Sequence, residues 1–264
     1  MNTAIRLVLG VSVLAAAAGC SGSTDTNNAS GGTGPIQIGG AGSGGSSSTT
    51  GGDSSGGGGG DLPPGVPLTP TNGWVDGASN TLGIQGAMFA FSDMVSGMGL
   101  VSDLTADHAC IKGTAAKVDL KCTPVAPATD CYGQFWGAAL GLNLKQPIDM
   151  STMMGGAPAP FDASALKGFA FDITGMTIPS PAAFRFKVED AKGEFCTPAT
   201  KAVKLGPNVF NFSDLIAECW APKATAATAD TAKADLLKIS WQVVTNSGGT
   251  VPFDFCVSNV RALN

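Results

Sequence analysis

The chain has 264 residues, and only 13% of them are charged, with a formal net charge of -5 and a pI near 4.7. This composition argues against a nucleic-acid-binding surface, which needs clustered Lys and Arg, and against a coiled coil or a highly charged tail. Glycine is over-represented at 37 residues, and most of the excess lies in one early stretch.

The first twenty residues predict an export signal. Arg6 supplies a short basic region, and residues 7–18 form an apolar run that is too short to span a bilayer. The segment Ala17-Ala18-Gly19-Cys20 resembles the lipobox of bacterial lipoproteins, although Leu is usual where this chain has Ala17. The resemblance implies a signal peptide over residues 1–19, acyl chains including palmitate on Cys20, and a lipid-anchored protein of the cell envelope, at the outer membrane or the cell surface. The alternative is an ordinary signal peptide followed by an incidental cysteine.

Residues 20–72 are predicted to form the lipidated cysteine and a disordered linker. From Ser21 to Asp61 the chain is mostly Gly, Ser, Thr and Asn, so it cannot bury enough apolar surface to offset the entropy of ordering. The segment Gly52–Gly56 matches the Gly-x-Ser-x-Gly nucleophile motif. That motif works only between a strand and a helix, and this composition forms neither. The linker is therefore interpreted as a spacer that holds a domain clear of the membrane.

Residues 73–264 are predicted to form one all-β domain, an antiparallel β-sandwich of the jelly-roll type. Apolar and polar residues alternate over residues 183–189 and 237–243, which is typical of strands that cover a core on one side. Helical periodicity is limited to one turn within 221–234 and another over 214–217 capped by Ser213. Further strands are expected at residues 82–91, 109–118, 135–144, 168–173, 209–212 and 253–263.

The cysteines predict a disulfide framework. With Cys20 acylated, six cysteines remain, and an even set in an exported domain is typical of disulfides. A zinc site is disfavoured, because the chain has no Cys-x-x-Cys pair and a single histidine. Fifteen pairings are open. Spacing favours two of the bridges and leaves the third by elimination: Cys122–Cys131, Cys196–Cys219 and Cys110–Cys256.

Three segments resemble strands of jelly-roll modules related to carbohydrate-binding modules of the galactose-binding-like kind. They are Gly83–Asp93, Phe135–Asn143 and Val251–Val260, which resemble an opening, a central and a closing strand. The resemblance implies a module that binds polysaccharide without cutting it. It also implies a structural calcium ion, with Asp93 and Asp254 as candidate ligands. The last strand has Ser258-Asn259 where such modules commonly carry an acidic residue, so surface aspartates without a metal are the alternative.

Aromatic side chains are the candidate ligand contacts of such a module. Trp241 shares its face with the apolar residues of its strand, which favours a place in the core. Tyr132 and Trp220 each adjoin a cysteine, in loops that disulfides would hold, so they are predicted to form the binding platform, with Trp136 as a third candidate. A neutral polysaccharide is expected, because an acidic protein repels polyanions.

Catalytic groups do not form a recognisable set. A glycosidase needs two carboxylates about 5–10 Å apart, and no pair stands out among Glu189, Glu194 and Glu218, the only glutamates. His108 is the lone histidine and lacks the context of a catalytic triad. The domain is therefore predicted not to be an enzyme. The alternatives are an envelope or surface interaction protein with no sugar ligand and, less favoured, a polysaccharide-degrading enzyme.

The lipobox resemblance makes a direct prediction. Labelled palmitate should be incorporated into the wild-type protein and not into a Cys20→Ser variant, because the thiol carries the diacylglycerol. Autoradiography of the purified proteins measures the outcome. Absence of label from the wild type would contradict the anchor.

Overall fold

The structure is a computed structural model that describes residues 62–264 apart from 106–107, 124–130, 150–153, 221–222 and 224. The predicted signal peptide, Cys20 and most of the predicted linker lie outside the described residues. Within the part of the chain that is described, no helix is both long and apolar enough to span a bilayer.

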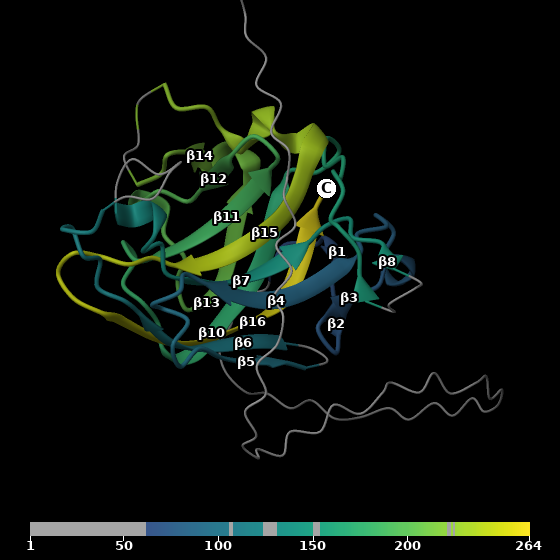
Figure 1. Cartoon of the computed structure of the whole chain (residues 1–264). Coiled ribbons are helices and arrows are strands. Elements are labelled where there is room, and N and C mark those ends of the chain that lie inside the picture. The colour runs from purple at the N-terminus through teal and green to yellow at the C-terminus, as the bar shows by residue number, and fades with distance from the viewer. Residues whose placement is uncertain (1–61, 106–107, 124–130, 150–153, 221–222, 224) are drawn as a thin grey trace, which may run out of the picture. The chain divides into compact units, whose positions relative to one another are not determined.

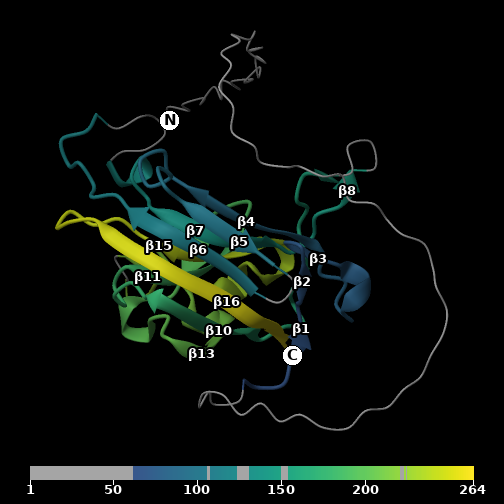
Figure 2. The ribbon, with the colours of Figure 1, turned by 90° about the horizontal axis from the view of Figure 1, so that it is seen from below.

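The described residues form two antiparallel sheets, which Figures 1 and 2 show as two layers. A six-stranded sheet has the order β13 (Gly206–Asn211), β10 (Gly168–Thr177), β16 (Val251–Leu263), β6 (His108–Ala115) and β5 (Val101–Leu104), with β1 (Val66–Pro67) also paired to β16. An eight-stranded sheet has the order β14 (Ile216–Ala217), β12 (Glu194–Cys196), β11 (Phe184–Asp190), β15 (Leu236–Val243), β7 (Ala138–Asn143), β4 (Gly86–Ser92), β3 (Trp74–Val75) and β2 (Pro70–Thr71). A separate pair joins β8 (Ile148–Asp149) to β9 (Met154–Gly155).

This architecture confirms the predicted all-β antiparallel sandwich. Each strand predicted from the sequence overlaps an observed strand, and the chain crosses repeatedly between the sheets. Along β11 the side chains of Phe184, Phe186 and Val188 are fully buried, as the alternating pattern predicts. The period of two therefore assigns one face of each strand to the core.

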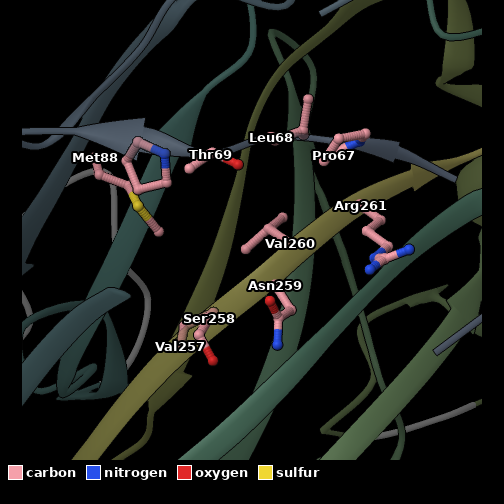
Figure 3. Close-up of a pocket in the computed structure, with 10 residues that line it drawn as sticks. Pro67, Leu68, Thr69, Met88, Val257, Ser258, Asn259, Val260 and Arg261 are labelled. Carbon is pink, nitrogen blue, oxygen red and sulfur yellow. The ribbon is translucent and has the colours of Figure 1, made fainter. Parts of the chain in front are cut away.

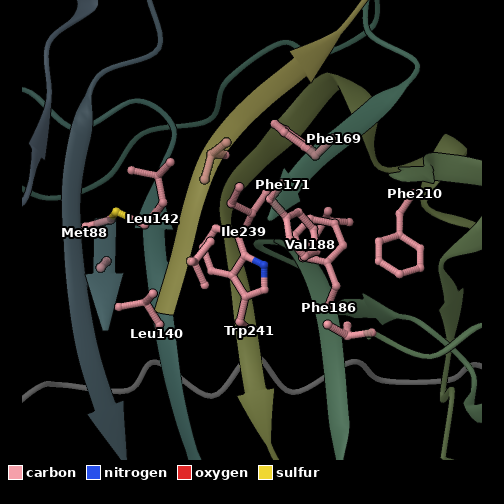
Figure 4. Close-up of a cluster of buried hydrophobic side chains, with 14 of the residues drawn as sticks. Met88, Leu140, Leu142, Phe169, Phe171, Phe186, Val188, Phe210, Ile239 and Trp241 are labelled. Carbon is pink, nitrogen blue, oxygen red and sulfur yellow. The ribbon is translucent and has the colours of Figure 1, made fainter. Parts of the chain in front are cut away.

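An aromatic cluster joins the two sheets at the centre of the core. Phe171 of β10 meets Trp241 of β15 edge to face, with ring centres 5.3 Å apart. Phe171 also lies 4.9 Å from Phe186, which stacks on Phe210 of β13 at 5.7 Å. Figure 4 shows these rings converging from both sheets around Trp241, which is fully buried. The predicted core position of Trp241 is confirmed.

Three disulfides connect the predicted cysteine pairs. Cys110 of β6 lies directly opposite Cys256 of β16, with their Cα atoms 3.9 Å apart. The bridges Cys122–Cys131 and Cys196–Cys219 close loops with sequence separations of 9 and 23. Because chain-entropy estimates grow with loop length, the bridge spanning 146 residues contributes the most, at about 4–5 kcal/mol.

The structure differs from the predicted elements in two places. Strands β1 and β2 lie before residue 73, so the sheets begin inside the segment assigned to the linker. Leu68 there is fully buried, and its N–H donates to the Val260 carbonyl at 2.8 Å. The prediction missed this docking because Pro-rich composition conceals a short edge strand.

The predicted helical turn over 214–217 capped by Ser213 is wrong. Residues 216–217 form β14, which pairs with β12 beside the Cys196–Cys219 bridge. The helical turn observed nearby is the 3-10 helix Phe212–Asp214, with Asn211 as its cap residue. Tertiary pairing thus overrides a weak local preference. In place of the single turn predicted within 221–234, the described residues hold two short 3-10 helices, Ala229–Thr231 and Lys233–Asp235.

The aromatic cluster predicts a large effect of truncation at Phe171. Phe171→Ala should lower the free energy of unfolding by about 3–5 kcal/mol, because the cavity opens between rings that cannot collapse onto it. Leu205→Ala is the control, since Leu205 is 60% exposed and its truncation should cost less than about 0.5 kcal/mol. Urea denaturation measures both, and equal effects would contradict the assigned core.

Candidate functional site

The outer face of the eight-stranded sheet carries three aligned rows of side chains. Strand pairing places the rows across β4, β7, β15 and β11, on the side opposite the core. From one end of the strands to the other, the rows are Phe91, Ala139, Gln242 and Arg185; Phe89, Gly141, Ser240 and Lys187; and Asn143, Lys238 and Glu189. Three of the residues on the middle strands are small: Ala139 and Gly141 on β7, and Ser240 on β15. Larger side chains of β4 and β11 lie on either side, so the middle of the face is lower than its edges.

A hollow of about 260 Å³ occupies this lowered region. It is lined by aromatic, polar and charged side chains from the three rows and from the two neighbouring segments: Phe91, Trp136, Ala139, Lys187, Glu189, Glu194, Lys238 and Gln242. The hollow is therefore bounded by an aromatic wall at β4 and by charged side chains of β11, β12 and β15. Of these, Lys238 of β15 reaches across to the aromatic wall, with its Nζ 4.9 Å from the centre of the Phe91 ring.

The aromatic wall consists of Phe89, Phe91 and Trp136. The ring centres of Phe89 and Phe91 are 5.3 Å apart, and those of Phe91 and Trp136 are 5.4 Å apart. Gly141 makes room for these rings, because a Cβ there would lie 3.0 Å from the Phe89 ring and 3.1 Å from the Phe91 ring. All three rings are only half-buried, so part of this aromatic surface faces solvent.

Hydrogen bonds hold Trp136 at the edge of the hollow. The Gln242 amide donates to the Trp136 carbonyl at 3.0 Å. The next residue, Gly137, donates its N–H to the Asp93 carboxylate at 2.6 Å. The backbone at residues 136–137 is thus bonded to both β15 and the turn after β4. These bonds position the Trp136 ring through its main chain and do not involve the indole N–H.

The charged wall is a chain of four ions. Lys187 pairs with Glu194 and lies 3.5 Å from Glu189, and Glu189 in turn pairs with Lys238 at 3.0 Å. The Ser240 hydroxyl donates to Glu189 at 3.3 Å. Lys187 has only 7% of its side chain exposed, so its charge is held by the two carboxylates more than by water. Two cations and two anions leave this wall without net charge.

Trp220 lies beyond the charged wall. The Arg185 guanidinium is 5.9 Å from the centre of its ring, within the range of a cation–π contact. Burial lowers the pKa of Arg185, and the nearby charge of Glu194 partly opposes that shift. Trp220 is 54% exposed and follows Cys219, whose bond to Cys196 fixes it beside β12.

The structure separates the predicted aromatic candidates. Trp136 lines the hollow, and Trp220 contacts Arg185 at the end of one of the three rows. Tyr132 is 44% exposed in the 3-10 helix Cys131–Gly133 and does not line the hollow.

The sequence interpretation missed most residues of the site. Phe91, Lys187, Lys238 and Gln242 were visible only as the outward positions of alternating strands. Glu189 and Glu194 lie opposite each other on β11 and β12, although the sequence showed no carboxylate pair. The signal that could have found them is the hairpin spacing, since two strands joined by a tight turn bring residues on either side of it face to face.

The two aspartates considered as calcium ligands have separate protein partners. Asp93 is buried, and its carboxylate oxygens accept the N–H groups of Ser96 and Gly137, each at 2.6 Å. Asp254 pairs with Lys112 at 3.1 Å on the six-stranded sheet. The described residues contain no cluster of three or more His, Cys, Asp or Glu side chains that could hold a metal ion.

Comparisons with known proteins give a structural similarity and no sequence match. No protein-family model and no curated protein sequence matches the chain. Among solved structures, the chain is similar to a family 11 carbohydrate-binding module from Clostridium thermocellum, solved in complex with a β-1,3-1,4-mixed-linked tetrasaccharide. The identity is 10%, the match covers 76% of this chain and 98% of the module, and the TM-score is 0.35. A likeness at this level assigns no ligand to the chain.

The charged wall predicts a stability effect at Lys187. Lys187→Ala should lower the free energy of unfolding by about 1–3 kcal/mol, because Glu189 and Glu194 lose the cation between them. Lys192→Ala is the matched control, since Lys192 is 81% exposed and 3.8 Å from Asp235, and its loss should cost less than about 0.5 kcal/mol. Urea denaturation at neutral pH compares them. Equal costs for the two lysines would show that the wall is not held by Lys187.

Proposed function

We propose that the chain is a binding module for a neutral polysaccharide, without catalytic activity, held on the cell envelope by lipid on Cys20. The observation that carries the ligand proposal is the hollow on the eight-stranded sheet. There a half-exposed aromatic wall lies beside a set of hydrogen-bonding groups whose charges cancel. The envelope location rests on the lipobox resemblance.

The two walls suit the two kinds of surface of a sugar ring. A pyranose has an apolar face of C–H groups, which packs on aromatic rings such as Phe91 and Trp136. Its edge carries hydroxyl groups that both donate and accept hydrogen bonds. The Gln242 amide also does both, Lys238 donates and Glu189 accepts. The groups around the hollow therefore match a neutral, hydroxyl-rich ligand with one apolar face.

The charge balance of the hollow favours a neutral ligand over a polyanion. Lys187 and Lys238 are each already paired with glutamate, so neither is a free cation for a sulfate or uronate. The chain as a whole carries a net charge of -5, which repels polyanions at long range.

The length of the face supports binding to a chain of sugars. From β4 to β11 the rows cross three inter-strand spacings, or about 14 Å at ~4.8 Å each. Trp220 extends the aromatic surface beyond β11 through its contact with Arg185. A single ring would contact only one wall and the floor, whereas linked rings lying across the strands can contact the aromatic wall, the charged wall and Trp220.

The aromatic wall predicts which truncations weaken binding. Trp136→Ala and Phe91→Ala should each reduce affinity for a retained polysaccharide by about 5–30-fold, because each ring contributes about 1–2 kcal/mol of packing. Tyr132→Ala is the matched control and should leave affinity unchanged. Affinity gels containing mixed-linkage β-glucan, xylan or glucomannan measure retention, and thermal unfolding checks that each variant is folded at the temperature of the gel.

Two outcomes would overturn the proposal. If none of these neutral polysaccharides retards the wild-type protein, the face does not bind such chains, and an interaction role in the envelope takes its place. If Tyr132→Ala weakens binding while Trp136→Ala does not, the ligand lies at the loops beside Cys131 and not in the hollow.

A further inference from the structure

One contact in the hollow of the eight-stranded sheet joins its charged wall to its aromatic wall. The Lys238 ammonium lies over the Phe91 ring, with its Nζ 4.9 Å from the ring centre. This distance is within the limit of about 6 Å for a cation–π contact. The same ammonium pairs with Glu189 at 3.0 Å. A side chain of the charged wall therefore covers part of the aromatic surface that the proposed ligand would contact.

The strand register makes this contact cross the floor of the hollow. Lys238 and Phe91 belong to the two outer rows of the face, and the row between them contains Gly141 and Ser240. The Phe91 ring lies against Gly141, where a Cβ would be only 3.1 Å from it. Because the middle row is low, the ammonium and the ring meet above it. The Lys238 side chain therefore occupies space through which a ligand would enter.

Lys238 is the member of the charged wall that is free to move. Its side chain is 26% exposed and pairs with one carboxylate among the described residues, whereas Lys187 is 7% exposed and lies between two. When Lys238 turns away from the ring, Glu189 keeps Lys187 at 3.5 Å and the hydrogen bond from Ser240 at 3.3 Å. The movement therefore leaves no carboxylate of the wall without a partner.

The size of the hollow favours the same movement. Its volume of about 260 Å³ is slightly below the ~300–1,000 Å³ of typical small-molecule sites. Lys238 is one of the residues that line it. Turning this side chain outward therefore enlarges the hollow and uncovers the Phe91 ring in one step.

The second hollow of the structure offers no comparable contact. It has a volume of about 90 Å³ and lies between residues 67–70 and β16 (Figure 3), with Leu68, Met88 and Val260 among its lining residues. None of the described residues that line it is aromatic. A ring covered by a lysine is thus a feature of the larger hollow, where the proposed ligand binds.

We propose that Lys238 is a displaceable cover of a sugar subsite on Phe91, an inference that rests on the proposed binding function. In the free protein the ammonium contacts both the ring and Glu189. An entering sugar replaces it on the ring through its C–H face, and the ammonium turns to the hydroxyl groups at the edge of the sugar. Lys238 thereby selects for ligands with an apolar face, because hydroxyl groups alone do not offset the lost cation–π contact.

Lys233 provides a matched control within the same chain. Its Nζ is 5.0 Å from the centre of the Phe212 ring, and it pairs with Asp230 at 2.7 Å. Its side chain is 23% exposed, close to the 26% of Lys238. The two lysines thus share a ring contact, a carboxylate partner and a degree of exposure, but Lys233 does not line the hollow.

Side-chain NMR of the ¹³C,¹⁵N-labelled full chain tests the displacement in the wild-type protein. Protons above an aromatic ring resonate upfield, so the ε-CH₂ signals of Lys238 and Lys233 should both lie upfield in the free protein. Tetrasaccharides of mixed-linkage β-glucan, xylan and glucomannan are the probes, and the Trp136 indole N–H signal reports binding. At saturation the Lys238 signal should move to the ordinary lysine position, and the Lys233 signal should stay.

A substitution at Lys238 tests the same inference through affinity. Lys238→Gln keeps a hydrogen-bond donor and removes the charge, so the Phe91 ring is open before the ligand arrives. Affinity for the bound tetrasaccharide should rise about 2–5-fold, because no cation–π contact has to be displaced. Lys233→Gln should leave the affinity unchanged. A general loss of structure would lower affinity, so a rise identifies the cover.

The outcomes separate failure of the cover from failure of the binding function. If a tetrasaccharide shifts the Trp136 signal while the Lys238 signal stays upfield, the cover is wrong and the binding function stands. The same conclusion follows if Lys238→Gln binds no more tightly than the wild type. If no tetrasaccharide shifts the Trp136 signal, the binding function fails and the cover fails with it. The wild-type titration decides even where the variant is unstable.

Discussion

The alternation of side chains along β15 couples the core to the candidate site. Trp241 points inward and meets Phe171 of the opposite sheet, while its neighbour Gln242 points outward and holds the Trp136 carbonyl. Because the side-chain period of a strand is two, a slip of one residue would exchange these faces and place Gln242 in the core. The aromatic packing between the sheets therefore sets the register of β15, and that register sets which polar groups face the hollow.

Small residues give the site its depth. Ala139, Gly141 and Ser240 form the floor between larger neighbours, and Gly141 also lets the Phe89 and Phe91 rings lie across β7. Glycine inside a strand costs stability because it packs poorly and is flexible when unfolded. Here the two Phe rings cover the position and recover part of the lost packing. Both the depth of the hollow and the placement of the aromatic wall therefore depend on the absence of a side chain at Gly141.

The sequence predicted the parts of the fold that depend on local patterns. Alternation placed Phe184, Phe186 and Trp241 in the core, and cysteine spacing with elimination led to the observed pairs. The site depends on which strands become neighbours, and residues from β4, β7, β15, β11 and β12 meet only after long-range pairing. Edge strands such as β1 and β14 were missed for the same reason, since two residues carry no period of their own.

The two sheets use their outer faces differently, which explains why only one offers an aromatic site. On the six-stranded sheet, outward side chains pair with one another across strands: Lys112 with Asp254 in an ion pair, Asn259 with Asp172 in a hydrogen bond, and Cys110 with Cys256 in a disulfide. No Phe, Tyr or Trp among its described residues takes an outward position, because Phe169, Phe171, Phe210, Phe253 and Phe255 are all buried in the core. The eight-stranded sheet instead carries Phe89 and Phe91 on its outer face. Beside them lie two lysines and two glutamates whose charges cancel. These rings pack on Gly141, on each other and on Trp136, and Lys238 lies over Phe91, yet each keeps part of its surface open to solvent, which is the surface that the proposed ligand would cover.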